Sequence, residues 1–441
     1  MNVISLTLAF WVLMIGTPLA AQLHSGPMPG YVGIREAILW LQTSAPTTVT
    51  VKYWAADSPT DHFFSQPLAL DRSTDFTAHI RLYDLQPGTV YEYRVLLDEQ
   101  EVRFPYVLTF HTQPLWQWRN PPPNFEVVVG SCAYINETPF DRPGMHYGGA
   151  FEIFNTIASR HPAFMLWLGD SLYLREVDFL SPQGLAYRYR HTRSFPPLQK
   201  LLQSTHHVAI WDDHDYGPDN ANRAWIYKDQ ALDHFQRYWA NPSYGLQELR
   251  GIFTVVSYGD IDFFLLDNRF YRDDDRAPEE PGKAMFGKAQ MDWLKNALLM
   301  SRASFKVVAG GSQFFDNQSR WEGWNHFPNE KELFLEWLRH VKPTGVLFLS
   351  GDRHATKFIR YNQNVPYPLY ELTCSPLTST PGNPRNDELN HWVVEGTIVG
   401  ERNFCTLNFS GEGSHRTVNI QSHNTQGKVL WNHSIEIQEL Q

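Results

Sequence analysis

The sequence contains few cysteines, and this scarcity argues against a fold built on disulfide bridges. Among 441 residues there are only three, Cys132, Cys374 and Cys405, and they lie far apart. An exported protein that is stabilised by disulfides normally carries more cysteines, in an even number. At most one bridge can form, which leaves one thiol unpaired, and Cys132 is the candidate for that role.

An excess of basic residues is also missing. The chain has 37 Lys and Arg against 47 Asp and Glu, which gives a formal net charge of −10. A general nucleic-acid-binding protein would present a basic face, so this composition argues against a stable nucleic-acid complex. It does not exclude an anionic substrate, because bound metal cations would reverse the charge locally.

Long hydrophobic runs are absent except at the N-terminus. The apolar run from Val3 to Thr17 is followed by small residues up to Ala21, which suits signal-peptidase cleavage. A run of about 15 residues is shorter than the roughly 20 needed to span a bilayer. We therefore expect residues 1–21 to be a signal peptide and the mature protein, without a transmembrane span, to be exported to the periplasm, the cell surface or the medium. A buried N-terminal helix or an uncleaved anchor is the alternative.

Apolar and aromatic residues, in contrast, are plentiful. Hydrophobic residues make up 42% of the chain, aromatic residues 14% and charged residues 19%. Such a chain can bury a large core, which excludes disorder by composition and favours a folded enzyme. A prior of roughly 100–200 residues per domain predicts about two or three domains.

The first quarter of the chain has the pattern of a small β-sandwich. Residues 49–53 and 91–95 alternate apolar and polar side chains, as half-buried strands do. The string Leu-x-Pro-Gly-Thr-x-Tyr-x-Tyr (85–93) resembles the corner of a fibronectin type III-like sandwich, where a buried tyrosine ties the turn to the strand. We predict such a sandwich over residues 30–113. Three successive prolines then predict a stiff linker over residues 114–124.

Beyond the linker, apolar strands alternate with amphipathic helices, which predicts an α/β catalytic domain over residues 125–441. The expected strands cover residues 125–130, 163–168, 207–211, 261–266, 306–309 and 345–349. The expected helices cover residues 151–159, 287–300 and 329–340.

Most of these strands end at residues that can bind a metal. The residues that follow them are Cys132, Asp170, Asp212 with Asp213, Asp267 and Asp352. Ligands of open α/β sheets bind at the carboxyl ends of the strands. A single Gly-Asp pair after a strand is also an ordinary turn, but its recurrence on several strands predicts one common site.

Three motifs strengthen this prediction. In Gly-Asp-x-x-Tyr (169–173) the carboxylate can bridge two cations, and a phenolate suits Fe(III). The loop from Trp211 to Asn220 packs four carboxylates, an imidazole and an amide into ten residues, a set that suits hard cations such as Ca²⁺, Mg²⁺ or Mn²⁺. Gly-Asp-x-His (351–354) adds a carboxylate and an imidazole. The alternatives are a tyrosine packed under its loop, a solvated acidic loop and a core histidine.

Together these motifs carry a family resemblance. The order Gly-Ser-Cys (130–132), Gly-Asp-x-x-Tyr (169–173), Trp-Asp-Asp-His-Asp (211–215), Leu-Asp-Asn-Arg (266–269), Phe-Gly-x-x-Gln-x-x-Trp-Leu (286–294) and Gly-Asp-x-His (351–354) resembles the alkaline phosphatase D (PhoD-like) family of metallophosphoesterases. It is also similar to purple acid phosphatases, which share the Gly-Asp-x-x-Tyr element. The resemblance implies an α/β (α+β) sandwich in which helices flank two mixed sheets. It covers residues from about 30 to 380.

The resemblance also implies roles for individual residues. Cys132, Asp170, Tyr173 and His354 would surround Fe(III), with Asp170 bridging to one or two divalent ions, expected to be Ca²⁺. The divalent ions would be held by Asp213, Asn220 and Asp352, with Asp212 and Asp267 as further candidates. His214 would stand beside the leaving group. The phosphoryl oxygens would be bound by Arg269, with Arg175 and Arg353 as further candidates.

The expected activity is the hydrolysis of small phosphate monoesters by a hydroxide that the metals supply at ambient pH. A phosphodiesterase or phospholipase D-like activity at the same metals is the alternative, because ligands alone do not separate them. A cysteine hydrolase with Cys132 as nucleophile leaves the acidic loop unexplained, and a non-catalytic binding protein leaves the intact ligand set unexplained. The Trp-rich loop 321–326 either walls the cleft or packs on the surface.

Overall fold

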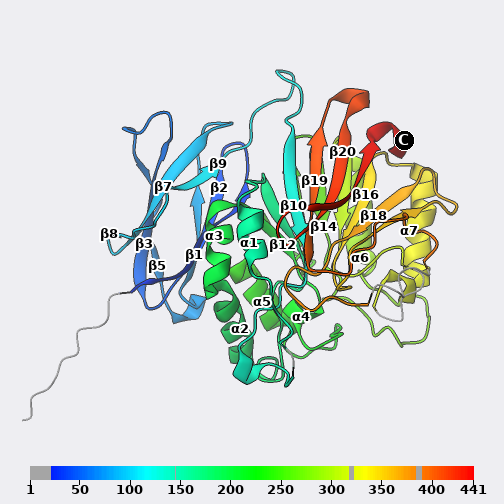
Figure 1. Ribbon diagram of the computed structural model, residues 1–441, viewed down its shortest axis with the longest axis horizontal. Helices are drawn as coiled ribbons and strands as arrows, with labels where there is room; N and C mark the ends of the chain where they lie inside the picture. The colour runs from blue at the N-terminus through cyan, green and yellow to red at the C-terminus, as the bar shows by residue number, and fades with distance from the viewer. Residues whose placement is uncertain (1–20, 145, 317–321, 384–389) are drawn as a thin grey trace, which may run out of the picture.

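A computed structural model of the chain describes residues 21–144, 146–316, 322–383 and 390–441. Except for Ala21, the predicted signal peptide lies outside the described residues. Figure 1 shows three layers: a β-sandwich on one side, a group of helices next to it, and two larger sheets with further helices beyond them. Among the described residues, no helix combines the length and apolarity that crossing a membrane requires.

The N-terminal part is a β-sandwich of two sheets. The first sheet has the order β1-β2-β6, and the second has the order β4-β3-β7-β8, with β5 on β3 and β9 on β7. The strands are β1 (Leu23–Val32), β2 (Ala37–Thr43), β3 (Thr47–Ala55), β4 (Phe63–Phe64), β5 (Leu68–Leu70), β6 (Thr77–Leu82), β7 (Val90–Leu97), β8 (Gln100–Glu101) and β9 (Leu108–His111). Tyr91 is buried, and its hydroxyl accepts a hydrogen bond from the Gln86 backbone N–H at 2.7 Å. The tyrosine thus ties the turn to β7, as the fibronectin type III-like corner predicts.

Two mixed six-stranded sheets form the second part, as the fold class predicts. One has the order β12-β11-β10-β19-β20-β21 and the other the order β13-β14-β15-β16-β18-β17. The strands of the first are β10 (Phe125–Gly130), β11 (Phe164–Leu168), β12 (His207–Ile210), β19 (Asn403–Ser410), β20 (Thr417–Asn424) and β21 (Val429–Glu436). Those of the second are β13 (Thr254–Tyr258), β14 (Ile261–Leu265), β15 (Phe305–Ala309), β16 (Val346–Ser350), β17 (Lys357–Tyr361) and β18 (Leu369–Thr373). The region after residue 380 therefore supplies three strands of the first sheet.

Helices cover the outer faces of both sheets. Figure 1 shows α1, α2, α3 and α5 between the sandwich and the first sheet, and α7 at the opposite side of the molecule. The helices are α1 (Glu152–Ala158), α2 (Pro182–Ser194), α3 (Pro196–Ser204), α4 (Asp213–Tyr216), α5 (Lys228–Tyr238), α6 (Lys288–Met300) and α7 (Pro328–Val341). Short 3-10 turns are η1 (Arg72–Thr74), η2 (Thr138–Phe140), η3 (Trp324–His326), η5 (Gly413–His415) and η6 (Ile437–Leu440).

One continuous apolar core runs between the two large sheets, and central strands such as β11, β12, β15 and β16 are buried on both faces. The sandwich has its own core, and three further residues of its strands, Met28, Ile38 and Trp40, belong to the larger core. Trp40 of β2 packs into the larger core and donates a hydrogen bond from Nε1 to the Arg237 carbonyl at 2.9 Å. His206 accepts the His111 backbone N–H at Nε2, and its Nδ1 contacts the Gly30 carbonyl at 3.0 Å. These contacts hold the sandwich against the helices that back the first sheet.

Candidate metal centre

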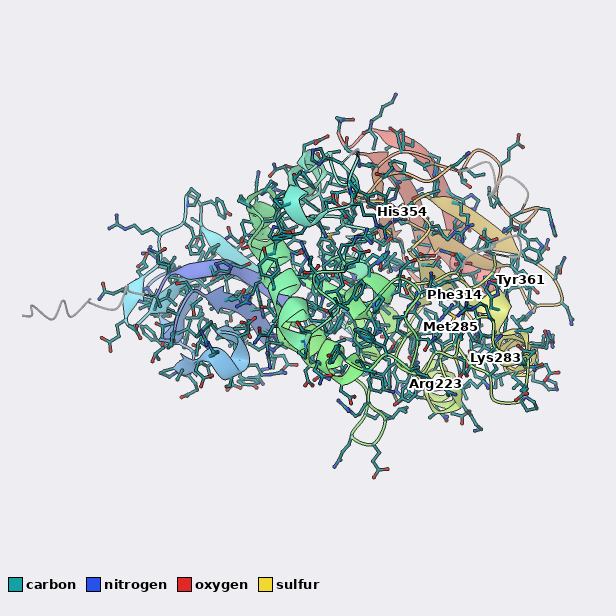
Figure 2. All side chains as sticks on the ribbon, turned by 90° about the horizontal axis from the view of Figure 1, so that it is seen from below. Arg223, Lys283, Met285, Phe314, His354 and Tyr361 are labelled. Carbon is teal, nitrogen blue, oxygen red and sulfur yellow. The ribbon has the colours of Figure 1, made fainter. Side chains whose placement is uncertain are left out.

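The carboxyl ends of the central strands bring distant segments to one edge of the molecule. Strands β10, β11 and β12 run parallel in adjacent positions, and β14, β15, β16 and β18 do the same in the second sheet. Each set therefore ends at the same side, where α4 follows β12 directly. Figure 2 shows His354, which follows β16, on the far side of the green helices from the sandwich.

Five of the residues at these strand ends have left-handed backbone conformations. The φ angles are 60° at Cys132, 51° at Asp170, 59° at Asn220, 69° at Asp352 and 53° at His354. Positive φ is uncommon for residues other than glycine, and such strain concentrates where a side chain must be aimed at a ligand. All five belong to the ligand set that the family resemblance implies.

Two glycines allow the turns at the strand ends to lie in close contact. A Cβ at Gly169 would lie 2.7 Å from the Asp212 Cβ, and one at Gly351 would lie 2.5 Å from the Leu168 carbonyl oxygen. The turns after β11, β12 and β16 therefore pack backbone against backbone.

The first group of potential ligands contains Cys132, Asp170 and His354, whose ligand atoms lie within 4.8 Å of one another. The Cys132 Sγ is 3.6 Å from the Asp170 Oδ2. The Tyr173 hydroxyl is 3.3 Å from the same oxygen and 3.0 Å from the His354 Nε2. Thiol, carboxylate, phenol and imidazole therefore converge on one point, as the sequence predicts.

The second group contains Asp170, Asp213 and His214, again within 4.8 Å. Asp170 is common to both groups, so its carboxylate can bridge two sites. The Asp170 Oδ1, the Asp213 Oδ1 and the His214 Nδ1 are buried and have no hydrogen-bond partner among the described residues. Buried polar atoms without partners are rare in folded proteins and need an explanation, which a bound cation would supply.

The third group contains Asp212, Asp213 and Glu322. Asp212 and Glu322 both form ion pairs with Arg269, whose side chain is fully buried. The second oxygen of Asp212, Oδ2, is another buried atom without a partner in the described part of the chain. Glu322 was not predicted as a site residue. Its only sequence signal is its position in the Trp-rich loop 321–326.

The electrostatics of the centre favour cation binding. Burial, followed by the neighbouring carboxylates Asp213 and Asp212, raises the pKa of Asp170 well above its usual value. Burial also raises the pKa of Asp212 and of Asp213 to about 6, although Arg269 opposes it. Burial and the Asp170 carboxylate raise the pKa of the Cys132 thiol. These acids repel each other in a medium of low polarity, and multivalent cations would relieve that repulsion. The donor set of thiol, phenol, imidazole and carboxylates therefore fits metal ions.

Asp267, a further candidate ligand, already has protein hydrogen-bond donors on both carboxylate oxygens. Its Oδ1 accepts hydrogen bonds from the Trp211 Nε1 and the backbone N–H groups of Arg269 and Phe270. Its Oδ2 accepts the Ile252 backbone N–H at 3.0 Å. Both oxygens are already used by protein donors, so Asp267 fixes the turn after β14 and does not join the three groups.

Arg269, which the resemblance assigns to the phosphoryl oxygens, forms ion pairs within the protein. Its guanidinium is fully buried and donates hydrogen bonds to Asp212, Glu322 and the Ala221 carbonyl. This side chain orients Asp212 instead of facing a substrate. Arg175 is better placed to contact a phosphoryl group. Its Nε donates to the Tyr134 hydroxyl at 3.2 Å, while neither Nη atom has a hydrogen-bond acceptor among the described residues.

Two predicted ligands lie beside the groups without belonging to them. The Asn220 backbone N–H donates to the Asp213 Oδ2 at 2.7 Å, and its side-chain Nδ2 lies 3.2 Å from the Asp219 Oδ2. Asp352 is half-buried next to Arg353, and burial raises its pKa well above the usual value. Among the described residues, Asp352 belongs to none of the three groups of His, Cys, Asp and Glu side chains.

The segment after β18 supplies contacts that were not predicted. The Ser375 hydroxyl donates to the Cys132 Sγ at 3.1 Å and accepts the His354 backbone N–H at 2.9 Å. The Ser379 hydroxyl lies 3.2 Å from the His354 Nε2. The Tyr147 hydroxyl lies 3.2 Å from the other ring nitrogen, Nδ1. The strand-end rule would have found Ser375, because β18 also ends at this edge of the sheet.

Comparison with known proteins supports this description. The family model of PhoD-like phosphatases matches residues 127–426, and a family described as a domain of unknown function (DUF7800) matches residues 20–114. Alkaline phosphatase D of Bacillus subtilis (strain 168) is 26% identical over 333 residues, which is 64% of this chain and 53% of that protein. The match thus spans about half the length of this relative.

Two solved structures share the fold. A structure of PhoD superposes with a TM-score of 0.74 and 17% identity, covering 94% of this chain and 90% of that one. Purple acid phosphatase PPD1 from yellow lupin (Lupinus luteus) seeds superposes with a TM-score of 0.65 and 11% identity, covering 95% and 74%. At these identities the two structures establish the architecture, and the family match over most of the second part establishes descent. The chain belongs to the PhoD-like phosphatase family.

Proposed function

We propose that this protein is a metal-dependent phosphoesterase that hydrolyses small phosphate monoesters. The observation that carries the proposal is the cluster of buried ligand atoms around Asp170, which two groups share and whose Oδ1 has no partner among the described residues. Bound cations would neutralise the phosphoryl oxygens and lower the pKa of a water molecule, which is the chemistry that ester hydrolysis needs.

The proposed ligand set divides into two parts. Cys132, Tyr173 and His354 would hold Fe(III) together with Asp170, because the thiol and the phenol both contact the Asp170 Oδ2 and the imidazole contacts the phenol. Ca²⁺ would be held by the oxygen-rich part of the site, which contains Asp212, Asp213, Asn220 and Asp352. Hard cations prefer such carboxylate and amide oxygens.

Two side chains then act on the substrate. Arg175 presents its guanidinium beside the Tyr173 ring, with the guanidinium carbon 5.3 Å from the ring centroid, and would bind phosphoryl oxygens through its Nη atoms. The His214 ring packs against the Tyr173 ring, with centroids 4.3 Å apart, and would donate a hydrogen bond to the leaving oxygen. His214 also belongs to a potential ligand group, so its two roles need an experiment.

The first test is elemental analysis of the purified protein together with assays of p-nitrophenyl phosphate and its bis ester, before and after chelation. We expect iron and calcium, and monoester hydrolysis that chelation abolishes and metal restores. A preference for the bis ester would assign a phosphodiesterase. A metal-free protein, or hydrolysis that chelators do not affect, would refute the proposal.

The His214→Asn variant separates the two roles of the imidazole. Loss of hydrolysis with unchanged metal content would place His214 beside the leaving group. Loss of metal would make it a ligand. Asp229→Asn is a suitable control, because this exposed carboxylate pairs with Arg250 away from the cluster.

We also propose that the protein is exported, on the basis of the apolar run from Val3 to Thr17 and the small residues after it. N-terminal sequencing of protein recovered from the host's periplasm or medium would test this. A mature N-terminus near residue 21 would support export, and an intact Met1 in protein found only in the cytoplasm would refute it.

A further inference from the structure

Two of the three cysteines lie against each other at the point where the two large sheets meet. Cys374 directly follows β18 of the second sheet, and Cys405 lies in β19 of the first (Figure 1). Both are buried free thiols in this structure. A covalent bond between their sulfur atoms would therefore join the two sheets.

Shared contacts place the two sulfur atoms side by side. The Sγ atoms of Cys374 and Cys405 each lie 3.9 Å from the same atom, the Asn403 Oδ1. The Cys374 Sγ also donates a hydrogen bond to the Val129 carbonyl at 3.4 Å. Val129 is the register partner of Cys405 in the pairing of β10 with β19.

The Cys374 thiol also contacts Cys405 directly. Burial, followed by a hydrogen bond with the Cys405 thiol, raises the pKa of the Cys374 thiol well above its usual value, and the Cys405 backbone N–H opposes this rise. The Cα atoms of a disulfide-bonded pair lie about 4.4–6.8 Å apart, so each sulfur must come close to the other residue's backbone. The Cys374 sulfur already meets that requirement.

The third cysteine lies in different surroundings. Cys374 and Cys405 belong to the large apolar core, whereas Cys132 belongs to a separate cluster of buried residues. The Cys132 Sγ contacts the Ser375 hydroxyl at 3.1 Å and the Asp170 Oδ2 at 3.6 Å. Among the described residues, the sulfur atoms of Cys132 and Cys374 share no hydrogen-bond partner.

The chain between Cys374 and Cys405 supplies one wall of the candidate metal centre. The Ser379 backbone N–H donates to the Cys132 carbonyl at 3.1 Å, and the Ser379 hydroxyl lies 3.2 Å from the His354 Nε2. A disulfide would close this segment into a covalent loop. Closing a loop stabilises the folded state, because it restricts the unfolded chain.

We propose that Cys374 and Cys405 form a disulfide bond that stabilises this loop and leaves Cys132 as the single free thiol. One S–S bond forms and two S–H bonds break. The two protons and two electrons pass to a disulfide oxidant, a protein or a small molecule, whose own S–S bond breaks to give two thiols. The inference goes beyond the proposed phosphoesterase function and does not depend on it.

The burial of both thiols determines when the bond can form. Cys374 and Cys405 are each 0% exposed, so an oxidant must reach them before the two sheets close. Disulfides form in oxidising compartments outside the cytoplasm. The bridge in the cell therefore rests on the proposed export, and the test supplies the oxidising compartment independently of it.

The test counts free thiols in protein made in two compartments of one bacterial host. Residues 22–441 are produced with a secretion signal of the host, which directs them to the oxidising periplasm, and without one, which keeps them in the reducing cytoplasm. Each sample is unfolded without reductant and alkylated with iodoacetamide, and mass spectrometry counts the alkyl groups.

We expect one alkyl group in the periplasmic protein, on Cys132, and three in the cytoplasmic protein. Digestion of the periplasmic protein should give a disulfide-linked pair of peptides that contain Cys374 and Cys405. Three alkyl groups in the periplasmic protein, or a bridge that includes Cys132, would overturn the proposal.

Two variants check the pairing. In Cys405→Ser the Cys374 thiol has no partner, so the periplasmic protein should carry two alkyl groups. Cys132→Ser is the matched control, and its periplasmic form should carry none, because the bridge still forms. Two alkyl groups in periplasmic Cys132→Ser would contradict the proposal.

Melting temperatures, measured after chelation, test the effect of the bond on the loop. The bridged wild type is expected to melt at least about 3 °C above the wild type with three free thiols. Cys405→Ser should melt at the same temperature from both compartments, which separates the bond from the packing of the sulfur atom. Equal melting temperatures for the two wild-type forms would show that the bond does not stabilise the loop and would overturn that part of the inference.

Discussion

Buried carboxylates occur in two regions of the molecule, and they differ in what occupies their oxygen atoms. Glu371 in β18 accepts the backbone N–H groups of Phe314 and Phe315 and the Ser350 hydroxyl, so both of its oxygens have partners. Asp267 after β14 is equally well bonded. At the candidate metal centre, by contrast, Asp170 and Asp213 each keep one buried oxygen without a hydrogen-bond partner among the described residues.

His206 and His214 also differ in whether their ring nitrogens have hydrogen-bond partners. Both ring nitrogens of His206, at the boundary with the sandwich, have backbone partners. The Nδ1 of His214 has none in the described part of the chain. A saturated buried group stabilises the loop or interface around it, whereas an unsaturated one indicates a place for a ligand. Burial and charge alone do not separate Asp170 from Asp267, but the hydrogen-bond partners of their oxygens do.

The strongest test of this comparison is the replacement of Asp170 by asparagine. We expect at least a 1000-fold fall in phosphatase activity and loss of bound metal, because the bridging carboxylate is removed. The metal-free variant should unfold no more easily than the metal-free wild type, since one of several repelling carboxylates is gone. Activity assays, elemental analysis and chemical unfolding measure the three effects. If the variant retained its metals, Asp170 would not be a metal ligand.

Metal addition is expected to produce the next largest effect. A ligand present at 100 times its Kd stabilises the folded state by about 2.7 kcal/mol. Calcium and iron should therefore raise the melting temperature of the metal-free wild type, and of Asp267→Asn by the same amount. In Asp170→Asn the increase should be absent. An equal increase in all three proteins would mean that the metals bind elsewhere.

Asp267→Asn tests the saturated side of the comparison. The amide keeps one acceptor oxygen and replaces the other by an NH2 group, so at least one of the four protein donors loses its acceptor, and we expect the free energy of unfolding to fall by about 1.5–3 kcal/mol. Metal content should stay at the wild-type level. The free energy of unfolding and the metal content together distinguish Asp267 from Asp170. Loss of metal from a folded Asp267→Asn protein would show that Asp267 is a ligand.

The smallest effect concerns pH and His206. Burial lowers the pKa of His206 to about 4, from 6.5. Because the folded-state pKa is depressed, its contribution to stability is fully present above pH 6.5 and is lost as pH falls toward 4. At pH 5.5, about one unit below the unfolded value, the loss amounts to about 1.4 kcal/mol. Thermal unfolding at pH 7 and pH 5.5 should show this loss, and His206→Gln should reduce it. An identical pH dependence in the variant would contradict the assignment.

Much of the fold followed from the sequence because the large sheets are buried. Apolar runs such as 163–168 and 207–211 became β11 and β12 nearly to the residue, since a strand covered on both faces leaves an uninterrupted apolar signal. The predicted helices at 287–300 and 329–340 became α6 and α7 for the related reason that one face of each is buried. The strands β19 to β21 have no uninterrupted apolar run. Their place in the first sheet depends on the long-range pairing of β19 with β10.

The site was predictable where ligands follow strands, and less so elsewhere. Cys132, Asp170 and His354 meet as their strand-end positions predict. Asp267 has the same sequence signal, but its carboxylate accepts the N–H groups of its own turn, and only coordinates distinguish these two uses. Glu322 was not predicted because no strand precedes it, and the sequence does not show the ion pairs that Arg269 forms with Asp212 and Glu322.

The contact between Ser375 and Cys132 has a consequence for how the protein is made. These residues are 243 positions apart, and β10, which precedes Cys132, pairs with β19 from still later in the chain. During synthesis β10 meets one neighbour, β11, early, but its other neighbour, β19, exists only when most of the chain has left the ribosome. Contacts of such high sequence separation form late and leave partly folded chains exposed to misfolding. The contact between Ser375 and Cys132 is therefore formed at a late stage of folding, and a nascent or truncated chain would leave this thiol without its Ser375 partner.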